Sequence, residues 1–114
     1  MKIASFNDTL QFNHERITTN VILETSFSKE IRILLTKGQK MKAHKTPFPI
    51  VVHVLEGSID FGVLGGISSL EKGAIIALKG NVSHDLTALK DSVIRLTLSK
   101  LDTAKRVENI AKSS

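Results

Sequence analysis

The chain has 114 residues, a length that suits one folded domain built around one hydrophobic core. Hydrophobic residues make up 41% of it, too many for a disordered chain, and the lack of cysteine excludes disulfides, thiolate metal sites and a cysteine nucleophile. The net charge is +5, and the lysines that dominate it are dispersed along the chain. There is no Tyr, no Trp and only five Phe, so the aromatic stacking platforms of single-strand binders are missing. This composition argues against a nucleic-acid partner.

The N-terminal residues 1–12 lack the continuous apolar stretch and small-residue cleavage site of a signal peptide. No segment approaches the roughly 20 apolar residues that a membrane-spanning helix requires. Together with the absence of cysteine, these features predict a cytoplasmic protein with no membrane partner.

The first part of the chain predicts two strands, residues 17–24 and residues 30–36, joined by a turn over residues 25–29. Apolar and polar residues alternate in the second of them, where Ile31, Ile33 and Leu35 mark a face directed at the core. Such alternation is typical of a strand that is buried on one side.

All seven glycines and both prolines lie between residues 38 and 80, so this part of the chain is rich in turns. Residues 49–57 predict a strand that is apolar on both faces, and residues 58–70 predict a hairpin turning at Gly65 and Gly66. Residues 74–78 and 91–98 predict further strands. About eight short strands in all indicate an all-β sandwich or barrel.

Residues 101–114 differ from the rest, because their apolar residues recur near helical spacing. The span is too short for a helix that is stable without docking. We expect a C-terminal tail that contains a short helix.

Two segments, residues 38–57 and residues 73–88, share a distinctive spacing of glycine and histidine. A gap of five residues separates Gly38 from His44, and Gly57 closes the first segment. Gly73 and His84 recur in the second segment. With these spacings the chain resembles the cupin superfamily, whose first motif is Gly, five residues, His-x-His, three or four residues, Glu, six residues and Gly.

The resemblance implies one cupin domain over residues 1–114, a β-barrel of the double-stranded β-helix or jelly-roll type. In metal-binding cupins, two His and the Glu of the first motif join the His of the second motif to hold one divalent ion. Here the second His falls on Thr46 and the Glu falls on Ile50, so only His44 and His84 remain. No cofactor is firmly implied, and this incomplete set would bind Zn, Ni, Fe or Mn weakly, since such ions generally take three or four protein ligands.

We therefore interpret the site as a pocket, lined by His44, Thr46, Ile50 and His84, that binds a small molecule. Lysines near the two motifs would favour an anionic ligand if they cluster at the mouth of the barrel; they are Lys40, Lys42, Lys45 and Lys79. The alternative is a metal-assisted or histidine-based cupin enzyme, an isomerase, lyase or dioxygenase, because imidazole transfers protons near neutral pH. The lack of Tyr favours binding, since the metal-free cupin enzymes also use a Tyr or a charged partner.

Two other histidines bear on this interpretation. Strand alternation directs His53 to the face opposite Ile50, whereas the sequence leaves open whether His14 joins the site. The strand over residues 49–57 is apolar on both faces, and a second subunit is the simplest cover for the face that the barrel does not fill. The sequence therefore predicts a homodimer.

Overall fold

The structure, a computed structural model, describes residues 1–100. The predicted short C-terminal helix lies in residues 101–114, outside the described residues. Within residues 1–100 there is no helix long and apolar enough to cross a membrane.

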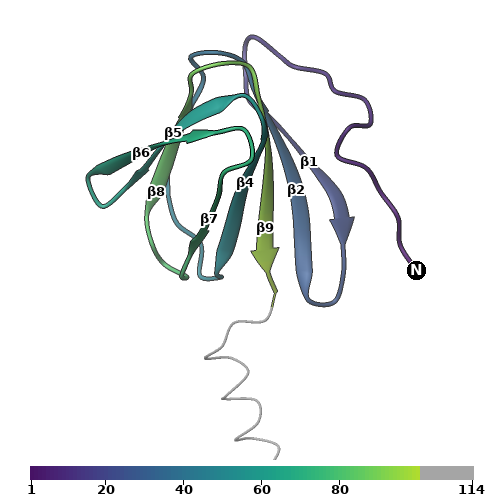
Figure 1. Cartoon of the computed structure of the whole chain (residues 1–114). Helices are drawn as coiled ribbons and strands as arrows, with labels where there is room; N and C mark the ends of the chain where they lie inside the picture. The colour runs from purple at the N-terminus through teal and green to yellow at the C-terminus, as the bar shows by residue number, and fades with distance from the viewer. Residues whose placement is uncertain (101–114) are drawn as a thin grey trace, which may run out of the picture.

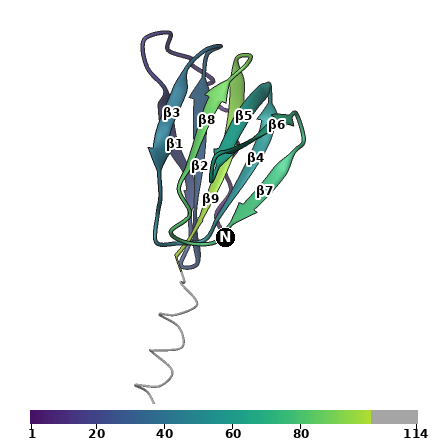
Figure 2. The same cartoon turned by 90° about the vertical axis from the view of Figure 1, so that its left-hand side faces the viewer.

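Within residues 1–100, nine strands form two antiparallel sheets that pack face to face (Figures 1 and 2). The strands are β1 (Thr18–Glu24), β2 (Ser28–Leu35), β3 (Lys40–His44), β4 (Ile50–Glu56), β5 (Ser58–Val63), β6 (Gly66–Glu71), β7 (Ile75–Leu78), β8 (His84–Ala88) and β9 (Ser92–Ser99). The five-stranded sheet has the order β1-β2-β9-β4-β7, and the four-stranded sheet has the order β3-β8-β5-β6. The all-β prediction is confirmed for the described residues.

The core lies between the two sheets and is made of the inward-facing residues of both. Its buried members are Ile33, Leu35, Ile50, Val52, Val54, Ile59, Phe61, Leu86, Ala88 and Ile94. The alternation predicted for the second strand is confirmed, because Ile33 and Leu35 belong to this core and Ile31 packs against it. Each fully buried side chain of this kind contributes about 1.5–3 kcal/mol to stability.

The β5–β6 hairpin turns one residue earlier than the sequence predicts. Its two turn residues are Leu64 and Gly65, with φ angles of 52° and 81°, and Gly66 already pairs with Val63. Positive φ at both positions is the requirement of a type I′ two-residue hairpin turn. This register places Ile59 opposite Leu70, so that both contribute to the core, whereas a turn at the two glycines would place Ile59 opposite a lysine.

Two strands, β3 and β8, were not among the individual strands predicted. The β3 sequence, KMKAH, contains no β-branched residue, and its pairing with β8 is interrupted between Met41 and His44. Strand β2 also begins two residues before its predicted start, because the Thr25 hydroxyl accepts the backbone N–H groups of Phe27 and Ser28 and tightens the turn.

Candidate functional site

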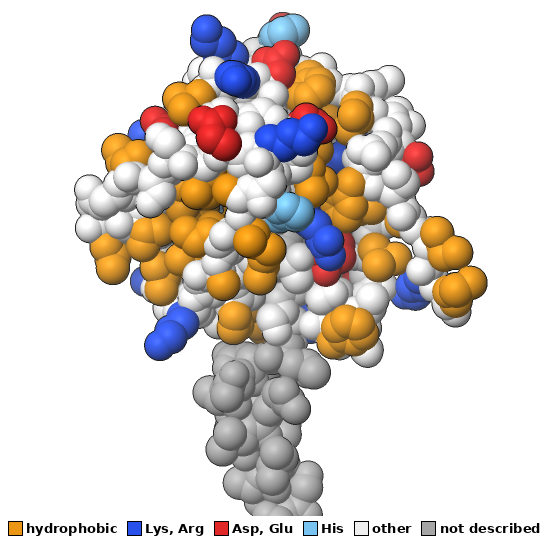
Figure 3. Space-filling view, in the orientation of Figure 1, with side chains coloured by type: hydrophobic (Ala, Val, Ile, Leu, Met, Phe, Trp, Pro, Cys, Tyr) orange, Lys and Arg blue, Asp and Glu red, His pale blue; other side chains and the backbone are white. Residues whose placement is uncertain are grey.

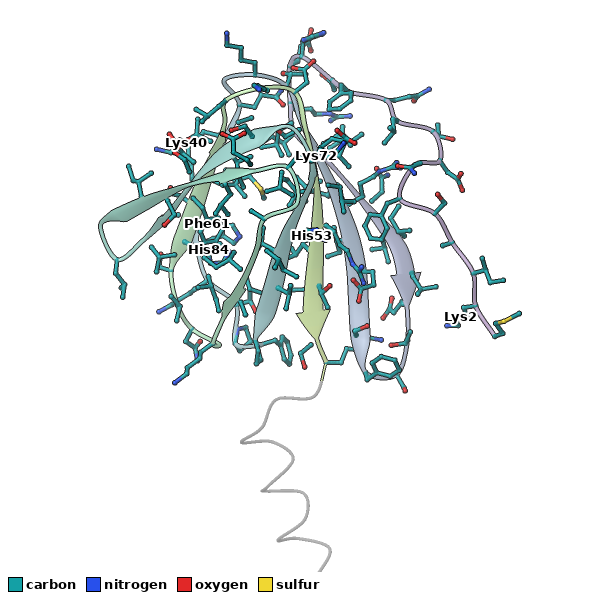
Figure 4. All side chains as sticks on the ribbon, viewed as in Figure 1. Lys2, Lys40, His53, Phe61, Lys72 and His84 are labelled. Carbon is teal, nitrogen blue, oxygen red and sulfur yellow. The ribbon has the colours of Figure 1, made fainter. Side chains whose placement is uncertain are left out.

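His44 and His84 lie together in the structure. His44 ends β3, His84 begins β8, and the two are paired across the strands, with ring centroids 4.4 Å apart and ring planes inclined by 58°. His84 is 5% exposed and stacks on Phe61 with a centroid distance of 5.7 Å (Figure 4). His44 is exposed, so the imidazole pair reaches from the core to solvent.

Both rings use the same nitrogen to contact the main chain. His44 Nδ1 lies 2.9 Å from the carbonyl oxygen of Lys42, and His84 Nδ1 lies 3.0 Å from that of Val82. A carbonyl oxygen only accepts hydrogen bonds, so each Nδ1 donates and carries a proton. In the neutral ring the lone pair is then on Nε2, the arrangement that histidines bound to a metal or a hydrogen-bond donor commonly have.

A small cavity lies between the sheets beside the imidazole pair. Its volume is about 20 Å³, and its other lining residues are all apolar: Ile33, Met41, Val52, Leu86, Ile94 and Leu96. That volume accommodates one water molecule or one ligand atom with its hydrogens. This cavity is therefore too small for a whole organic molecule and can receive only a single polar group.

Thr46 and Ile50, the other two predicted pocket residues, do not line this cavity. Thr46 lies in the loop after β3, where its hydroxyl accepts the Phe48 N–H at 2.9 Å. Ile50 begins β4 and is 4% exposed within the core. Thr46 therefore stabilises the loop after β3, and Ile50 packs in the hydrophobic core.

The donor set does not fit a tightly held divalent ion. The described part of the chain contains no group of three or more His, Cys, Asp or Glu that could hold a metal. An ion at His44 and His84 would have two imidazole ligands and no carboxylate to neutralise it, in a cavity otherwise lined by hydrocarbon.

The remaining histidines lie elsewhere. His53 is half-buried on the outer face of the five-stranded sheet, paired across the strands with Ile75 and Arg95, as strand alternation predicts (Figure 4). His14 is exposed in the segment before β1 and lines neither this cavity nor the larger hollow described next.

A larger hollow of about 490 Å³ lies on the outer face of the four-stranded sheet, and sequence reasoning missed it. Its lining includes Lys40, Asp60 and Asp85 around Gly62. Asp85 Oδ1 lies only 2.5 Å from where a Cβ atom at residue 62 would stand, so the carboxylate occupies the space that a side chain would fill. Alternation within β5 and β8 was the available signal, since it directs Asp60 and Asp85 to the face opposite the core.

Solved cupin structures superimpose on most of this chain. An RmlC-like cupin protein from Desulfovibrio desulfuricans is 20% identical, with a TM-score of 0.79 over 87% of this chain and 96% of that chain. An RmlC-like cupin from Shewanella frigidimarina is 18% identical, with a TM-score of 0.74 over 92% of this chain and 96% of that chain. A protein with a double-stranded β-helix domain from Klebsiella pneumoniae is 20% identical, with a TM-score of 0.75 over 87% and 89% of the two chains.

No protein-family model and no curated protein matches the sequence. The two packed antiparallel sheets and these structural similarities nevertheless define the class: the chain has the RmlC-like cupin fold, a double-stranded β-helix. The predicted resemblance to small cupins is confirmed at the level of the fold. The fold hosts many unrelated activities, so function has to be argued from the site itself.

Proposed function

We propose that the protein is a small-ligand-binding cupin in which His44 and His84 hold one polar group of the ligand. The observation that carries this proposal is the pair of imidazoles 4.4 Å apart, each anchored through Nδ1 to a main-chain carbonyl. Anchoring fixes both ring orientations and leaves both Nε2 atoms for the ligand, which reduces the entropy lost on binding.

The ligand would enter the barrel only with its tip, because the cavity beside the imidazoles measures about 20 Å³. Its body would lie against the exposed ring of His44, next to the exposed Lys42 and Lys45. The positive charges of these two lysines, two residues and one residue from His44 in the chain, favour a ligand whose exposed part is anionic.

A binding role fits this site better than catalysis. The side chains that share the interior cavity with the imidazoles are apolar, so inside the barrel the pair has no further polar group to orient a reacting atom or to accept its proton. The charged groups Asp60 and Asp85, which line the larger hollow with His84, belong to the outer face of the sheet. Two imidazoles alone suffice to recognise a hydroxyl, an ammonium group or, once protonated, a carboxylate.

The role of His44 can be tested by screening small carboxylic acids against ¹⁵N-labelled protein. We expect perturbation of the His44 and His84 ring signals by the acids that bind. His44→Ala should weaken binding about tenfold, the loss of roughly one charge-assisted hydrogen bond, while stability changes by less than about 0.5 kcal/mol because His44 is exposed. His53→Ala, on the opposite sheet face, is the matched control and should bind normally.

Elemental analysis of protein purified without an affinity tag separates this proposal from the enzyme alternative. We expect far less than one equivalent of Zn, Ni, Fe or Mn per chain. Stoichiometric metal that disappears in the His44→Ala/His84→Ala double variant would contradict the proposal and support a metal-assisted enzyme.

We also propose that a second copy of the chain covers the outer face of β4 and β7. On this face Val51 and Leu55 are half-buried, Ala77 is exposed and Ile75 is 64% exposed. Hydrophobic side chains gather over β7 in the space-filling view (Figure 3). The N-terminal residues cover other strands of the same sheet, so β4 and β7 present the uncovered apolar part.

Ile75→Lys is therefore expected to raise the dimer dissociation constant at least about tenfold, because it would bury an unpaired charge in the interface. Size-exclusion chromatography with light scattering over a range of concentrations measures the change. Ile67→Lys is the control, since Ile67 is 74% exposed but lies on β6 in the other sheet. A wild-type chain that is monomeric at every concentration would contradict the proposed dimer.

A further inference from the structure

A second polar cavity lies on the outer face of the five-stranded sheet, beneath the N-terminal segment. The segment, residues 1–13, runs along β1 in Figure 1 and is here called the N-terminal strap. The cavity has a volume of about 250 Å³, and all its lining side chains are polar: Thr9, Gln11, Thr18, Asn20 and Arg32. Its chemistry is the opposite of that of the apolar cavity beside His84.

Arg32 is the only charged residue of this cavity and is 4% exposed. Its guanidinium donates hydrogen bonds to three carbonyl oxygens of the strap: Nη1 to Phe6 at 3.0 Å and Asp8 at 2.5 Å, and Nη2 to Thr9 at 3.2 Å. No carboxylate among residues 1–100 forms an ion pair with it. These carbonyl oxygens accept hydrogen bonds from Nη1 and Nη2 but do not neutralise the charge, and a buried charge is costly unless a counter-charge accompanies it.

The neighbouring charges do not neutralise Arg32. Its cross-strand partner on β9 is Arg95, which lies on the same face of the sheet. Arg95 Nε donates to Glu30 Oε1 at 3.0 Å, and the Phe6 ring of the strap lies 5.4 Å from the Arg95 guanidinium carbon. Glu30 thus serves Arg95, and the two arginines together retain an excess positive charge.

Unsatisfied polar atoms also collect here. Among the described residues, only Thr18 Oγ1 and Arg32 Nε are buried side-chain polar atoms without a hydrogen-bond partner, and both residues line this cavity. Thr9, whose carbonyl oxygen accepts a hydrogen bond from Arg32 Nη2, has a φ of 49°. This conformation is uncommon for a β-branched residue. Buried unsatisfied groups and local strain are features that concentrate at ligand sites.

We propose that this cavity binds a small oxyanion, a carboxylate or a phosphate. The anion would supply the counter-charge that Arg32 lacks and accept hydrogen bonds from the guanidinium and from the Thr18 hydroxyl, with the amides of Asn20 and Gln11 as further donors. Asn20 is the cross-strand partner of Arg32, so the two side chains project from one position of the sheet face. The site is independent of the histidine pair and does not rest on the proposed ligand there.

Thr18→Val in the full-length chain gives the sharpest test, because the substitution keeps the shape of the side chain and removes the unsatisfied hydroxyl. Thermal unfolding is measured with increasing inorganic phosphate or acetate, with chloride used to hold the ionic strength constant. The wild-type Tm should rise by about 10 °C at an anion concentration about a hundredfold above Kd. Without anion, the Tm of the variant should exceed that of the wild type, because the buried hydroxyl without a hydrogen-bond partner has been removed. The variant should nevertheless bind the anion about tenfold more weakly, because it lacks the Thr18 donor.

Thr19→Val is the matched control, since Thr19 is exposed and points to the other face of β1; it should leave the anion affinity unchanged. Arg32→Gln should abolish the anion-dependent rise, and Thr18→Val keeps the test valid if that variant fails to fold. A response to phosphate alone or to acetate alone identifies which oxyanion the site takes. A wild-type Tm that responds no more to either anion than to chloride, or equal affinities in wild type and Thr18→Val, would overturn the proposal.

Discussion

Replacing Gly57 with Ala is expected to lower the free energy of unfolding by about 3 kcal/mol or more. Gly57 is the single residue between β4 and β5, where the chain passes from the five-stranded to the four-stranded sheet. Its φ is +92°, and a Cβ atom there would lie 2.5 Å from Asp91 O and 2.7 Å from Ser92 Cα. Both are backbone atoms, so relief requires moving the chain, and overpacking of this kind adds about 1–3 kcal/mol to the backbone strain.

Gly38→Ala is the matched control because Gly38 has nearly the same φ, +91°, with no atom within 4 Å of the added Cβ. Gly38→Ala should lower the free energy of unfolding by only about 1 kcal/mol, the cost of placing a residue with a Cβ atom at positive φ. Urea unfolding followed by circular dichroism measures both variants. Equal losses at the two positions would show that strain, rather than the contact with residues 91 and 92, decides the cost.

Glycines of the two motifs explain why the sequence predicts the fold although it lacks a complete set of metal ligands. Gly38, Gly57 and Gly73 were recognised as motif positions, and all three adopt positive φ, between 91° and 94°. They are backbone requirements of the turns that shape the jelly roll. A chain with Thr46 and Ile50 at the motif's ligand positions still needs these turns, so the motif spacing indicates the fold more directly than it indicates a metal.

The site was predictable only in part, for identifiable reasons. The motif spacing placed His44 and His84 together because both lie at the ends of paired strands. It also assigned Thr46 to the pocket, but Thr46 does not line the cavity beside the histidines. Its hydroxyl accepts the Phe48 N–H, a contact that is decided within the loop. The site at Arg32 was not predicted at all. Alternation marks this residue as facing away from the core, and only the strap, which has no periodic pattern, buries it.

Glu30 forms the ion pair with Arg95 on the strap side of the sheet. Glu30→Gln is expected to lower the free energy of unfolding by about 2 kcal/mol at pH 7. The carboxylate accepts hydrogen bonds from Ser28 Oγ, Arg95 Nε and Thr97 Oγ1. Removing one member of a buried ion pair costs about 3–5 kcal/mol, and the partial exposure of Arg95 reduces that loss. Glu56→Gln is the control, since its ion pair with Lys72 is exposed and should contribute well under 1 kcal/mol.

The pH dependence of stability provides a second readout of the same group. Burial raises the pKa of Glu30, but the hydrogen bonds from Thr97 and Arg95 and the charge of Arg95 outweigh burial and hold the pKa below its ordinary value of 4.5. A depressed carboxylate pKa stabilises the fold above that ordinary value, and this contribution is lost as pH falls through the lowered pKa. Urea unfolding of the wild type should therefore show a loss between about pH 5 and pH 3 that is smaller in Glu30→Gln. Parallel pH profiles for the two proteins would mean that Glu30 is not the carboxylate whose protonation destabilises the fold.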